Sequence, residues 1–339
     1  MGVASKMTRV AMLALWLLLI ASGVLAVTLG PADITPGEVW TSILHHLGIV
    51  PESPLSRLRD AIVWDLRLPR VLAATGVGAG LALAGAVMQA LTRNPLADPY
   101  LLGLSSGAAL GAVTLVVMGH ALLVPVGAFF GSLGALALAL LIAHVLGGTT
   151  PVRAILAGIS ISALASAATS FVIFWSATGD SYREILSWLL GTLSGANWAD
   201  AGLVVGSLVL CAPVILVMAR SLDAFAFGEA AATSLGVDVA RLRWTMLAAS
   251  ALLTGIMVAV GGAIGFVGLV VPHVVRFALG PQHRRLLPVA MLVGAIFMLW
   301  ADTMARTLFD PRELPVGIVT ALVGAPGFLL VLLRYRRVT

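Results

Sequence analysis

The longest uncharged segment of the chain constrains its fold more than any other feature. The 54 residues from Pro99 to Val152 contain no Asp, Glu, Lys or Arg. A spanning helix needs about 20 predominantly apolar residues, and its backbone polar groups must be satisfied within the helix because lipid offers no partners. The segment is long enough for two such helices, with a turn at Gly119–His120 and Pro125. It predicts a chain built from membrane-spanning helices.

The composition extends this interpretation to the whole chain. Hydrophobic residues make up 60% and charged residues only 10%, whereas a soluble domain carries about 25% charged residues. The ten predicted spans are Val10–Ala32, Val71–Thr92, two within 99–152, Ala154–Gly179, Ala201–Ala219, two within 244–279 on either side of Gly261-Gly262, Leu286–Ala301 and Leu314–Leu333. We therefore expect an all-α integral membrane protein, with about ten transmembrane helices in one compact domain over residues 1–339. The run Ile185–Ala199 is too short to span and predicts an interfacial helix and loop.

The first run has a second interpretation as a cleaved signal peptide. Lys6 and Arg9 precede it, and Ala26 and Thr28 are weak cleavage positions. Its 23 uncharged residues are long enough to span, which favours a retained first helix.

The distribution of basic residues predicts that both termini are cytoplasmic. With ten spans and an inside N-terminus, 13 of the 20 Lys and Arg residues fall on the inside and 7 on the outside. Cytoplasmic loops carry the excess of positive charge, so this split supports the orientation. The arginines follow the ends of apolar runs and form no patch, which argues against nucleic acid as a partner.

Several activities lack the residues that they require. The only lysine is Lys6, so no Walker A loop exists and the chain is not a P-loop ATPase. The only cysteine, Cys211, excludes a disulfide framework within the chain. No zinc-protease histidine pair and no G-x-S-x-G motif occurs. We therefore expect no catalytic residues, no metal site and no cofactor. His45-His46 is expected to be an incidental surface pair, with contact to a metal chelate as the alternative.

Two further features stand out by position. Asp302 and Arg306 are four residues apart near the end of the ninth span, where they can pair with each other or face a partner. The loop 220–243 mixes apolar and polar residues at helical spacing, with breaks at Gly228 and Gly236. It predicts two short amphipathic helices, either inserted into a cytosolic partner or anchored at the membrane surface.

Small residues at four-residue spacing predict close contacts between helices. They occur at Gly76/Gly80, Gly107/Gly111, Gly127/Gly131 and Gly261/Gly265.

An ordered set of motifs from about Asp65 to Leu333 resembles the FecCD-type permease family, which includes importers of vitamin B12, ferric siderophores and haem. Each motif is modest alone, and the order and spacing of the set are specific. The motifs are Arg67–Arg70, Gly85–Gln89, Arg93–Pro99, Leu102–Gly107, Gly261–His273, His283–Pro288, Asp302–Arg306 and Glu313–Pro326.

The resemblance implies a machine with several partners. Members pair as dimers around a central path, above two cytosolic ATPase subunits, and receive a chelate from a periplasmic or lipid-anchored binding protein. The matching positions imply docking by Arg67, Arg70 and Arg306, with interfacial anchoring as the alternative for the first two. They imply ATPase coupling within 220–243 by Leu222, Gly228, Glu229, Leu235 and Gly236, and a cytoplasmic gate at Thr149, Thr150, Pro151 and Val152.

The expected function is that of a permease subunit, in a bacterial inner membrane, which carries no ATPase of its own and moves its cargo by alternating access. An iron chelate, either a ferric siderophore or haem, is the first expectation for the cargo, and cobalamin is the second. A homodimer is expected. An ion-coupled secondary transporter is the alternative from another class.

Overall fold

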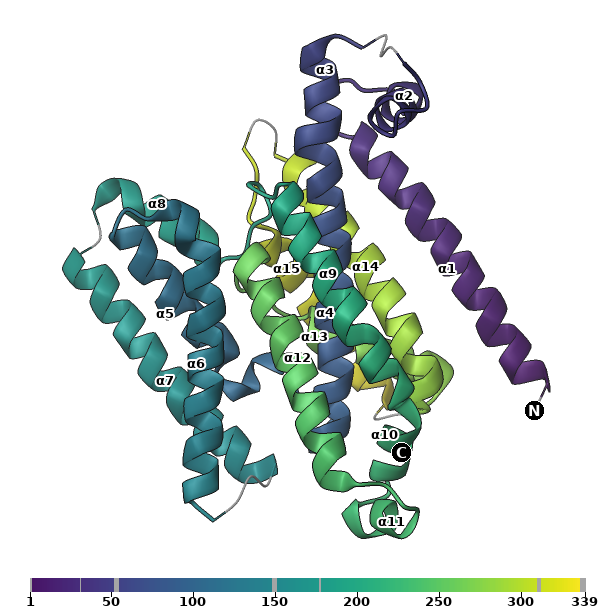
Figure 1. The fold of residues 1–339 in the computed structure, drawn as a ribbon, viewed down its shortest axis with the longest axis vertical. Coiled ribbons are helices and arrows are strands. Elements are labelled where there is room, and N and C mark those ends of the chain that lie inside the picture. Colours follow the sequence, from purple (N-terminus) through teal and green to yellow (C-terminus); the bar gives the residue numbers. More distant parts are fainter. Residues whose placement is uncertain are drawn as a thin grey trace.

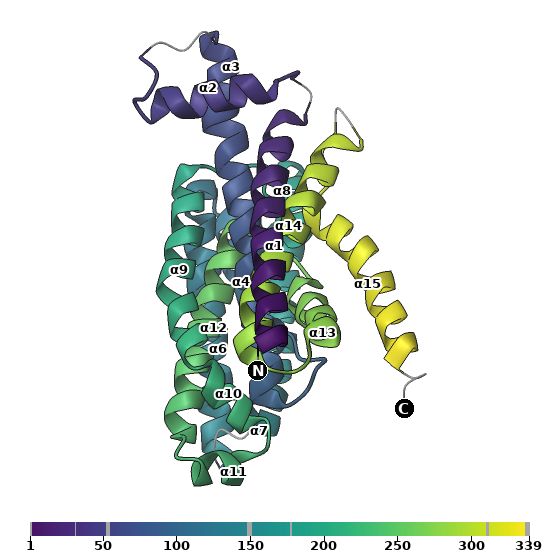
Figure 2. The ribbon, with the colours of Figure 1, turned by 90° about the vertical axis from the view of Figure 1, so that its right-hand side faces the viewer.

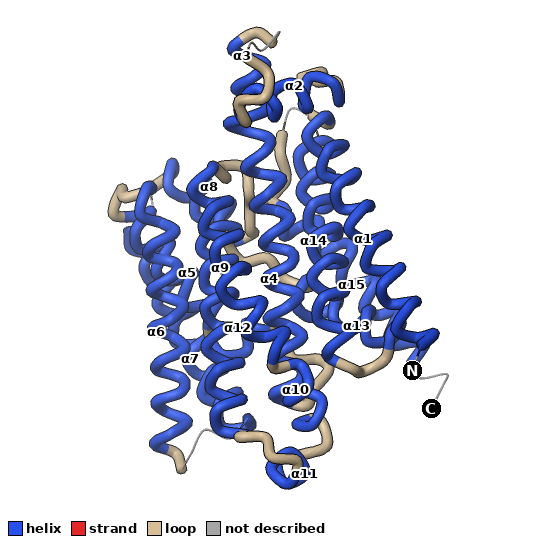
Figure 3. Tube along the Cα trace, turned by 45° about the vertical axis from the view of Figure 1, so that its right-hand side comes forward, coloured by secondary structure: helices blue, strands red, loops and turns tan. Residues whose placement is uncertain are grey.

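The computed structural model describes residues 2–30, 32–51, 55–147, 151–176, 178–309 and 312–335. These residues form helices and loops only, as the tube in Figure 3 shows. The helices are α1 (Gly2–Thr28), α2 (Pro36–His46), α3 (Arg57–Ala61), η1 (Ile62–Arg67), α4 (Leu68–Thr92), η2 (Pro99–Leu102), α5 (Leu104–Val117), η3 (Ala121–Leu123), α6 (Val124–Val145), α7 (Pro151–Ser176), α8 (Gly179–Leu189), α9 (Trp198–Val217), α10 (Ala219–Phe225), α11 (Glu229–Ser234), α12 (Val239–Gly261), α13 (Val267–Leu279), α14 (His283–Thr307) and α15 (Val316–Tyr335).

The predicted all-helical membrane fold is confirmed. In the described part of the chain, seven helical stretches are long and apolar enough to cross a membrane, and three shorter apolar helices accompany them. All ten fall on the predicted spans. The break between α12 and α13 has a clear cause at Gly262, whose φ is +71°. A Cβ there would lie 2.4 Å from the carbonyl oxygen of Trp188, so both the backbone conformation and the space require glycine.

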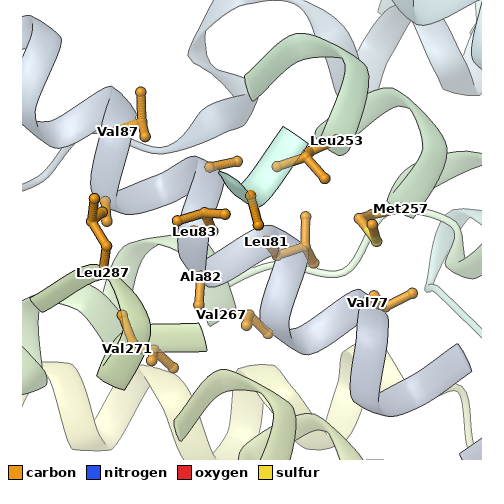
Figure 4. Packing of buried hydrophobic residues seen from close by; sticks show 14 of the residues in the cluster. Val77, Leu81, Ala82, Leu83, Val87, Leu253, Met257, Val267, Val271 and Leu287 are labelled. Carbon is orange, nitrogen blue, oxygen red and sulfur yellow. The ribbon is translucent and has the colours of Figure 1, made fainter. Parts of the chain in front are cut away.

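Helix α4 forms the centre of the larger half of the molecule. Nearly all of its residues are buried, and α9, α12, α13 and α14 pack around it. Figure 4 shows its aliphatic side chains between those of the neighbours: Leu81 lies near Leu253 and Met257 of α12, and Ala82 lies near Val267 of α13. In lipid, such close packing is a main source of helix association.

Helices α5, α6 and α7 form the smaller half, seen apart from the α4 group in Figure 1. The predicted glycine pairs hold α5 against α6. A Cβ on Gly107 would lie 2.3 Å from the Gly131 carbonyl oxygen, and one on Gly111 would lie 2.0 Å from that of Gly127. The backbones therefore touch, as predicted. The prediction was wrong for Gly265, which has no such neighbour within 4 Å.

Helices α2 and α3 project beyond the bundle at one end (Figure 2). This projection was not predicted. Thr35 caps α2 in a capping box with Glu38. The hydrogen bond from the Thr35 backbone N–H to the Glu38 carboxylate holds the pKa of Glu38 below its usual range.

The His46 ring stacks on Trp64 of η1 with centroids 4.0 Å apart. The π-helical segment η1 joins α3 to α4, and together they form one helix of 36 residues.

Helices α10 and α11 lie at the opposite end, near the start of α12 (Figure 1). Below, the two ends of the molecule are called the α2–α3 end and the α10–α11 end. Helix α1 begins, and α15 ends, on the side of the bundle away from α2 and α3 (Figure 2).

Candidate functional site

Three arginines that the motifs singled out gather at the α2–α3 end. Arg67 is the last residue of η1, Arg70 lies in the first turn of α4, and Arg306 lies in the last turn of α14. The structure brings them together with two acidic residues, Asp302 and Glu313. We call the three arginines the arginine cluster. All three are buried, with exposed fractions of 6%, 8% and 5% for Arg67, Arg70 and Arg306.

Arg70 is held between the two carboxylates. Its Nε donates to Asp302 Oδ2 at 2.9 Å, its Nη2 to Asp302 Oδ1 at 3.0 Å, and its Nη1 to Glu313 Oε2 at 2.8 Å. The Asp302 side chain is almost fully buried, whereas that of Glu313 is 44% exposed. The planar guanidinium thus forms a bidentate pair with one carboxylate and a second pair with the other.

Arg67 and Arg306 bind the end of α1. Arg67 Nη1 donates to the carbonyl oxygens of Val27 (2.7 Å) and Thr28 (3.0 Å), and Arg306 Nη1 donates to that of Leu29 at 3.0 Å. The last carbonyls of a helix have no partners within the helix and carry partial negative charge, so arginine satisfies both needs. These two arginines therefore fix α1 to α4 and α14.

The predicted pair of Asp302 and Arg306 is present but loose. Arg306 Nε lies 3.9 Å from Asp302 Oδ2, because Asp302 is already engaged by Arg70. The helical spacing of Asp302 and Arg306 predicted their pair. Nothing in the sequence indicated the pair of Asp302 with Arg70.

A hollow of about 360 Å³ opens over the arginine cluster. Glu313 and Asp65 lie in its wall with the loop that precedes α9. The lining residues are Ala32, Ile62, Asp65, Leu66, Arg67, Arg70, Ser194, Gly195, Ala196, Asn197, Arg306 and Glu313. The arginines thus form the wall of a polar recess.

The predicted coupling residues lie at the α10–α11 end and differ in exposure. Leu222 is fully buried, so it holds α10 on the bundle, whereas Leu235 is 70% exposed. Gly228 and Gly236 have φ of +106° and +80° and form the two turns that frame α11. Glu229 pairs with Arg243 of α12. Phe227, which was not predicted, is 81% exposed beside Gly228; an aromatic residue next to a predicted turn is the signal that was available.

A polar contact connects this end to α14. Asp223 of α10 accepts hydrogen bonds from the His283 backbone N–H at 2.7 Å and from His283 Nδ1 at 2.8 Å. Asp223 therefore caps the first turn of α14. That helix ends, 25 residues long, in the arginine cluster.

Of the predicted gate, Thr149 and Thr150 lie outside the described residues. Pro151 begins α7, where the fixed backbone angle of proline suits the first turn. Val152 follows and is 67% exposed. Within the described parts of the chain, no group of three or more His, Cys, Asp and Glu side chains is placed to hold a metal ion. His45 and His46 contact each other edge to face.

The fold is that of a multi-pass membrane protein with its charged contacts at the two ends of a helical bundle. The chain belongs to the FecCD transport family, whose profile matches residues 17–334. It is 45% identical over 285 residues to the hemin transport system permease protein HmuU of Yersinia pestis, covering 81% of this chain and 84% of that one. It is 41% identical over 307 residues to the cobalamin import system permease protein BtuC of Halobacterium salinarum, covering 90% and 82%.

A solved structure agrees with these relatives. A metal-chelate type ABC transporter in an inward-facing conformation matches with a TM-score of 0.85 and 34% identity, over 96% of this chain and 99% of that one. The chain is therefore a permease subunit of an ABC importer and a multi-pass protein of the bacterial inner membrane. Permease subunits of this family have no ATPase of their own.

Proposed function

We propose that this permease moves a metal chelate by alternating access, receiving it from a binding protein at the α2–α3 end and driven by two ATPase subunits at the α10–α11 end. The observation that carries the proposal is the position of α14. It starts at the Asp223 cap and ends in the arginine cluster. A helix of 25 residues is about 38 Å long, so one rigid element joins the two proposed partner surfaces.

Docking of the binding protein is proposed to use Arg67, Arg70 and Arg306 in two ways. Arg67 and Arg306 are engaged by α1 carbonyls, so they shape the hollow. Arg70 is the arginine that a partner carboxylate can reach, because its partner Glu313 is half-exposed and can move aside. When a carboxylate of the binding protein replaces that of Glu313, the charge balance around Arg70 is preserved. The new ion pair both attracts and orients the binding protein.

Coupling to the ATPase is proposed to use the surface between α10 and α12. Phe227 and Leu235 present apolar side chains, Gly228 and Gly236 set the turns, Glu229 holds α11 to α12, and Leu222 anchors α10. Exposed aromatic and aliphatic residues beside a polar rim are typical anchors of a protein interface. Motion of the ATPases reaches α14 through Asp223.

The gate is proposed to lie at Thr149, Thr150, Pro151 and Val152. Helix α7, which begins at Pro151, starts at the α10–α11 end (Figure 1). We propose a homodimer around a central path, since one chain carries both the surface proposed for the binding protein and the surface proposed for the ATPase. For the cargo we propose an iron chelate, with haem first because of the hemin relative at 45% identity, and cobalamin second because of its named relatives.

Reconstitution in liposomes tests the function and the cargo together. The permease, the partner ATPase and the binding protein are combined with haem, a ferric siderophore or cobalamin, and uptake is measured with ATP inside. We expect uptake of haem that vanadate abolishes and that a proton uncoupler leaves intact. Uptake that collapses with the proton gradient and ignores vanadate would instead show a secondary transporter. Uptake of cobalamin alone would retain the importer and overturn the haem proposal.

A further inference from the structure

An apolar groove of about 520 Å³ runs between α1 and α9, with α4 and α14 as its floor. Its walls carry Leu19 of α1 and Val205 and Leu216 of α9, and Pro288 and Ala295 of α14 lie at its base. Thr75 is its one hydroxyl side chain, and that hydroxyl donates to the Val71 carbonyl at 2.7 Å. Apart from the indole N–H of Trp16 on α1, the groove therefore presents an apolar lining to a ligand.

The groove is long enough to hold one acyl chain. Its lining on α9 extends from Val205 to Leu216, which is about 16 Å at 1.5 Å per residue. The hydrocarbon core of a bilayer is about 30 Å thick. Leu216 lies in the last turn of α9, and the lining on α4 runs from Leu72 to Ala79, in the half of α4 nearer the arginine cluster. The groove therefore extends from the α10–α11 end past the middle of the bundle.

Arginines flank the groove where it reaches the α10–α11 end. Arg284 and Arg285 lie one turn before Pro288 on α14, and Arg220 lies in the first turn of α10, just after Leu216. The side chains of these three arginines make no hydrogen bond or ion pair with any residue that the structure describes. The nearby acid, Asp223, is occupied by His283. This mouth of the groove is therefore strongly cationic.

We infer that this groove is a binding site for one anionic phospholipid of the cytoplasmic leaflet, with an acyl chain along α9 and the phosphate against Arg220, Arg284 and Arg285. Arginine suits phosphate because its planar fork donates two parallel hydrogen bonds. Basic pockets between transmembrane helices on the cytoplasmic side are a known way to bind anionic headgroups. The lipid would contact α9, α10 and α14 at once.

Native mass spectrometry of the full-length chain in detergent, with phosphatidylglycerol or phosphatidylcholine added, tests the site. We expect one tightly held phosphatidylglycerol per chain, with an affinity at least about tenfold above that for phosphatidylcholine. The double variant Arg284→Gln/Arg285→Gln should remove that preference. Arg241→Gln, at the same end but outside the groove, should keep it.

A tail variant tests the groove independently of charge. Thr75→Phe fills the floor and should lower the affinity for phosphatidylglycerol while the arginines remain; if it fails to fold, the arginine variants still decide. Equal affinity for the two lipids would overturn the inference, as would equal losses in Arg241→Gln and in the double variant. A second copy seated in the groove would also overturn it, and would be seen as cross-linking between copies through a cysteine introduced at Val209 in a Cys211→Ala background.

Discussion

Arg70 and Asp302 lie 232 residues apart in the sequence and meet in a bidentate ion pair, with Nε–Oδ2 and Nη2–Oδ1 distances of 2.9 and 3.0 Å. The pair joins the first turn of α4 to the end of α14 at the α2–α3 end. Asp302 is also the nearest carboxylate to Arg306. One buried aspartate therefore balances two buried arginines, with Glu313 as the only further acid in contact with Arg70 in the described chain.

Replacement of this aspartate should destabilise the protein strongly. In Asp302→Asn, Arg70 keeps only the half-exposed Glu313 and Arg306 loses its nearby charge. Loss of one partner from a buried ion pair costs about 3–5 kcal/mol. We expect a clearly lower midpoint of thermal unfolding in detergent. Asp65→Asn is the matched control, because Asp65 is exposed at the same end and has no polar partner among the described residues; an equal loss in both variants would contradict the role of the pair.

Neutralising Glu313 should strengthen docking of the binding protein. Glu313→Gln leaves Arg70 with one fewer carboxylate, so a carboxylate of the binding protein no longer has to displace a charged competitor. We expect the affinity to rise several-fold at low salt, as measured by surface plasmon resonance, and the gain to shrink at high salt. Asp65→Asn removes one negative charge from the same hollow. A gain of the same size in that variant would show a general field effect and no exchange at Arg70.

The spans could be predicted from the sequence because a segment in lipid must satisfy its backbone hydrogen bonds internally. A long uncharged run must become a helix, so the positions of Val71–Thr92 or Leu286–Ala301 follow almost from charge alone. The arginine cluster was predicted as residues but not as an arrangement. Local spacing shows Asp302 beside Arg306, whereas the stronger partner Arg70 depends on how α4 and α14 pack.

Burial at the α10–α11 end likewise depends on helix packing and could not be predicted from the local sequence. Leu222 lies in α10 and Leu235 directly follows α11, and both are leucines, yet Leu222 is fully buried and Leu235 is 70% exposed. Their difference arises from the packing of α10 against α14, which the sequence of the loop does not contain. The projection of α2 and α3 was missed because those helices have ordinary polar composition and no long apolar run.

Truncation of the exposed apolar residues at this end should weaken ATPase binding. Phe227→Ala and Leu235→Ala remove side chains that the fold does not need, since they are 81% and 70% exposed. Anchor residues of an interface cost about 2 kcal/mol or more when truncated, so we expect at least a tenfold loss of affinity for the partner ATPase in a pull-down titration. Leu122→Ala, which is 96% exposed on the connection between α5 and α6, should have no effect. Unchanged binding in both test variants would remove this surface from the coupling proposal.

Loss of the Asp223 cap should separate ATP hydrolysis from transport. In Asp223→Ala, the His283 backbone N–H and Nδ1 lose their acceptor, and a lost helix cap costs about 0.5–2 kcal/mol. The variant should fold and bind the ATPase, but loaded binding protein should stimulate hydrolysis less, because the polar link between α10 and α14 is lost. Asp223→Asn keeps an oxygen acceptor and should retain most of the stimulation. Thr35→Ala removes the cap of α2, away from α10, and controls for the stability change alone; a matching loss of stimulation there would contradict the link.

The crossing of α4 and α13 at Gly85 should tolerate no side chain. A Cβ on Gly85 of α4 would lie 1.9 Å from the carbonyl oxygen of Gly268 and 2.5 Å from its carbon. Both are backbone atoms, so the clash can be relieved only by moving α4 and α13 apart. Overpacking of this kind costs about 1–3 kcal/mol, and we expect Gly85→Ala to lower the thermal midpoint in detergent. Gly206→Ala is the matched control, because Gly206 lies within α9 with no such neighbour within 4 Å. Alanine there gains about 1 kcal/mol of helix propensity, so its midpoint should stay or rise. An unchanged midpoint in Gly85→Ala, or an equal fall in both variants, would contradict a role for the close contact of α4 and α13.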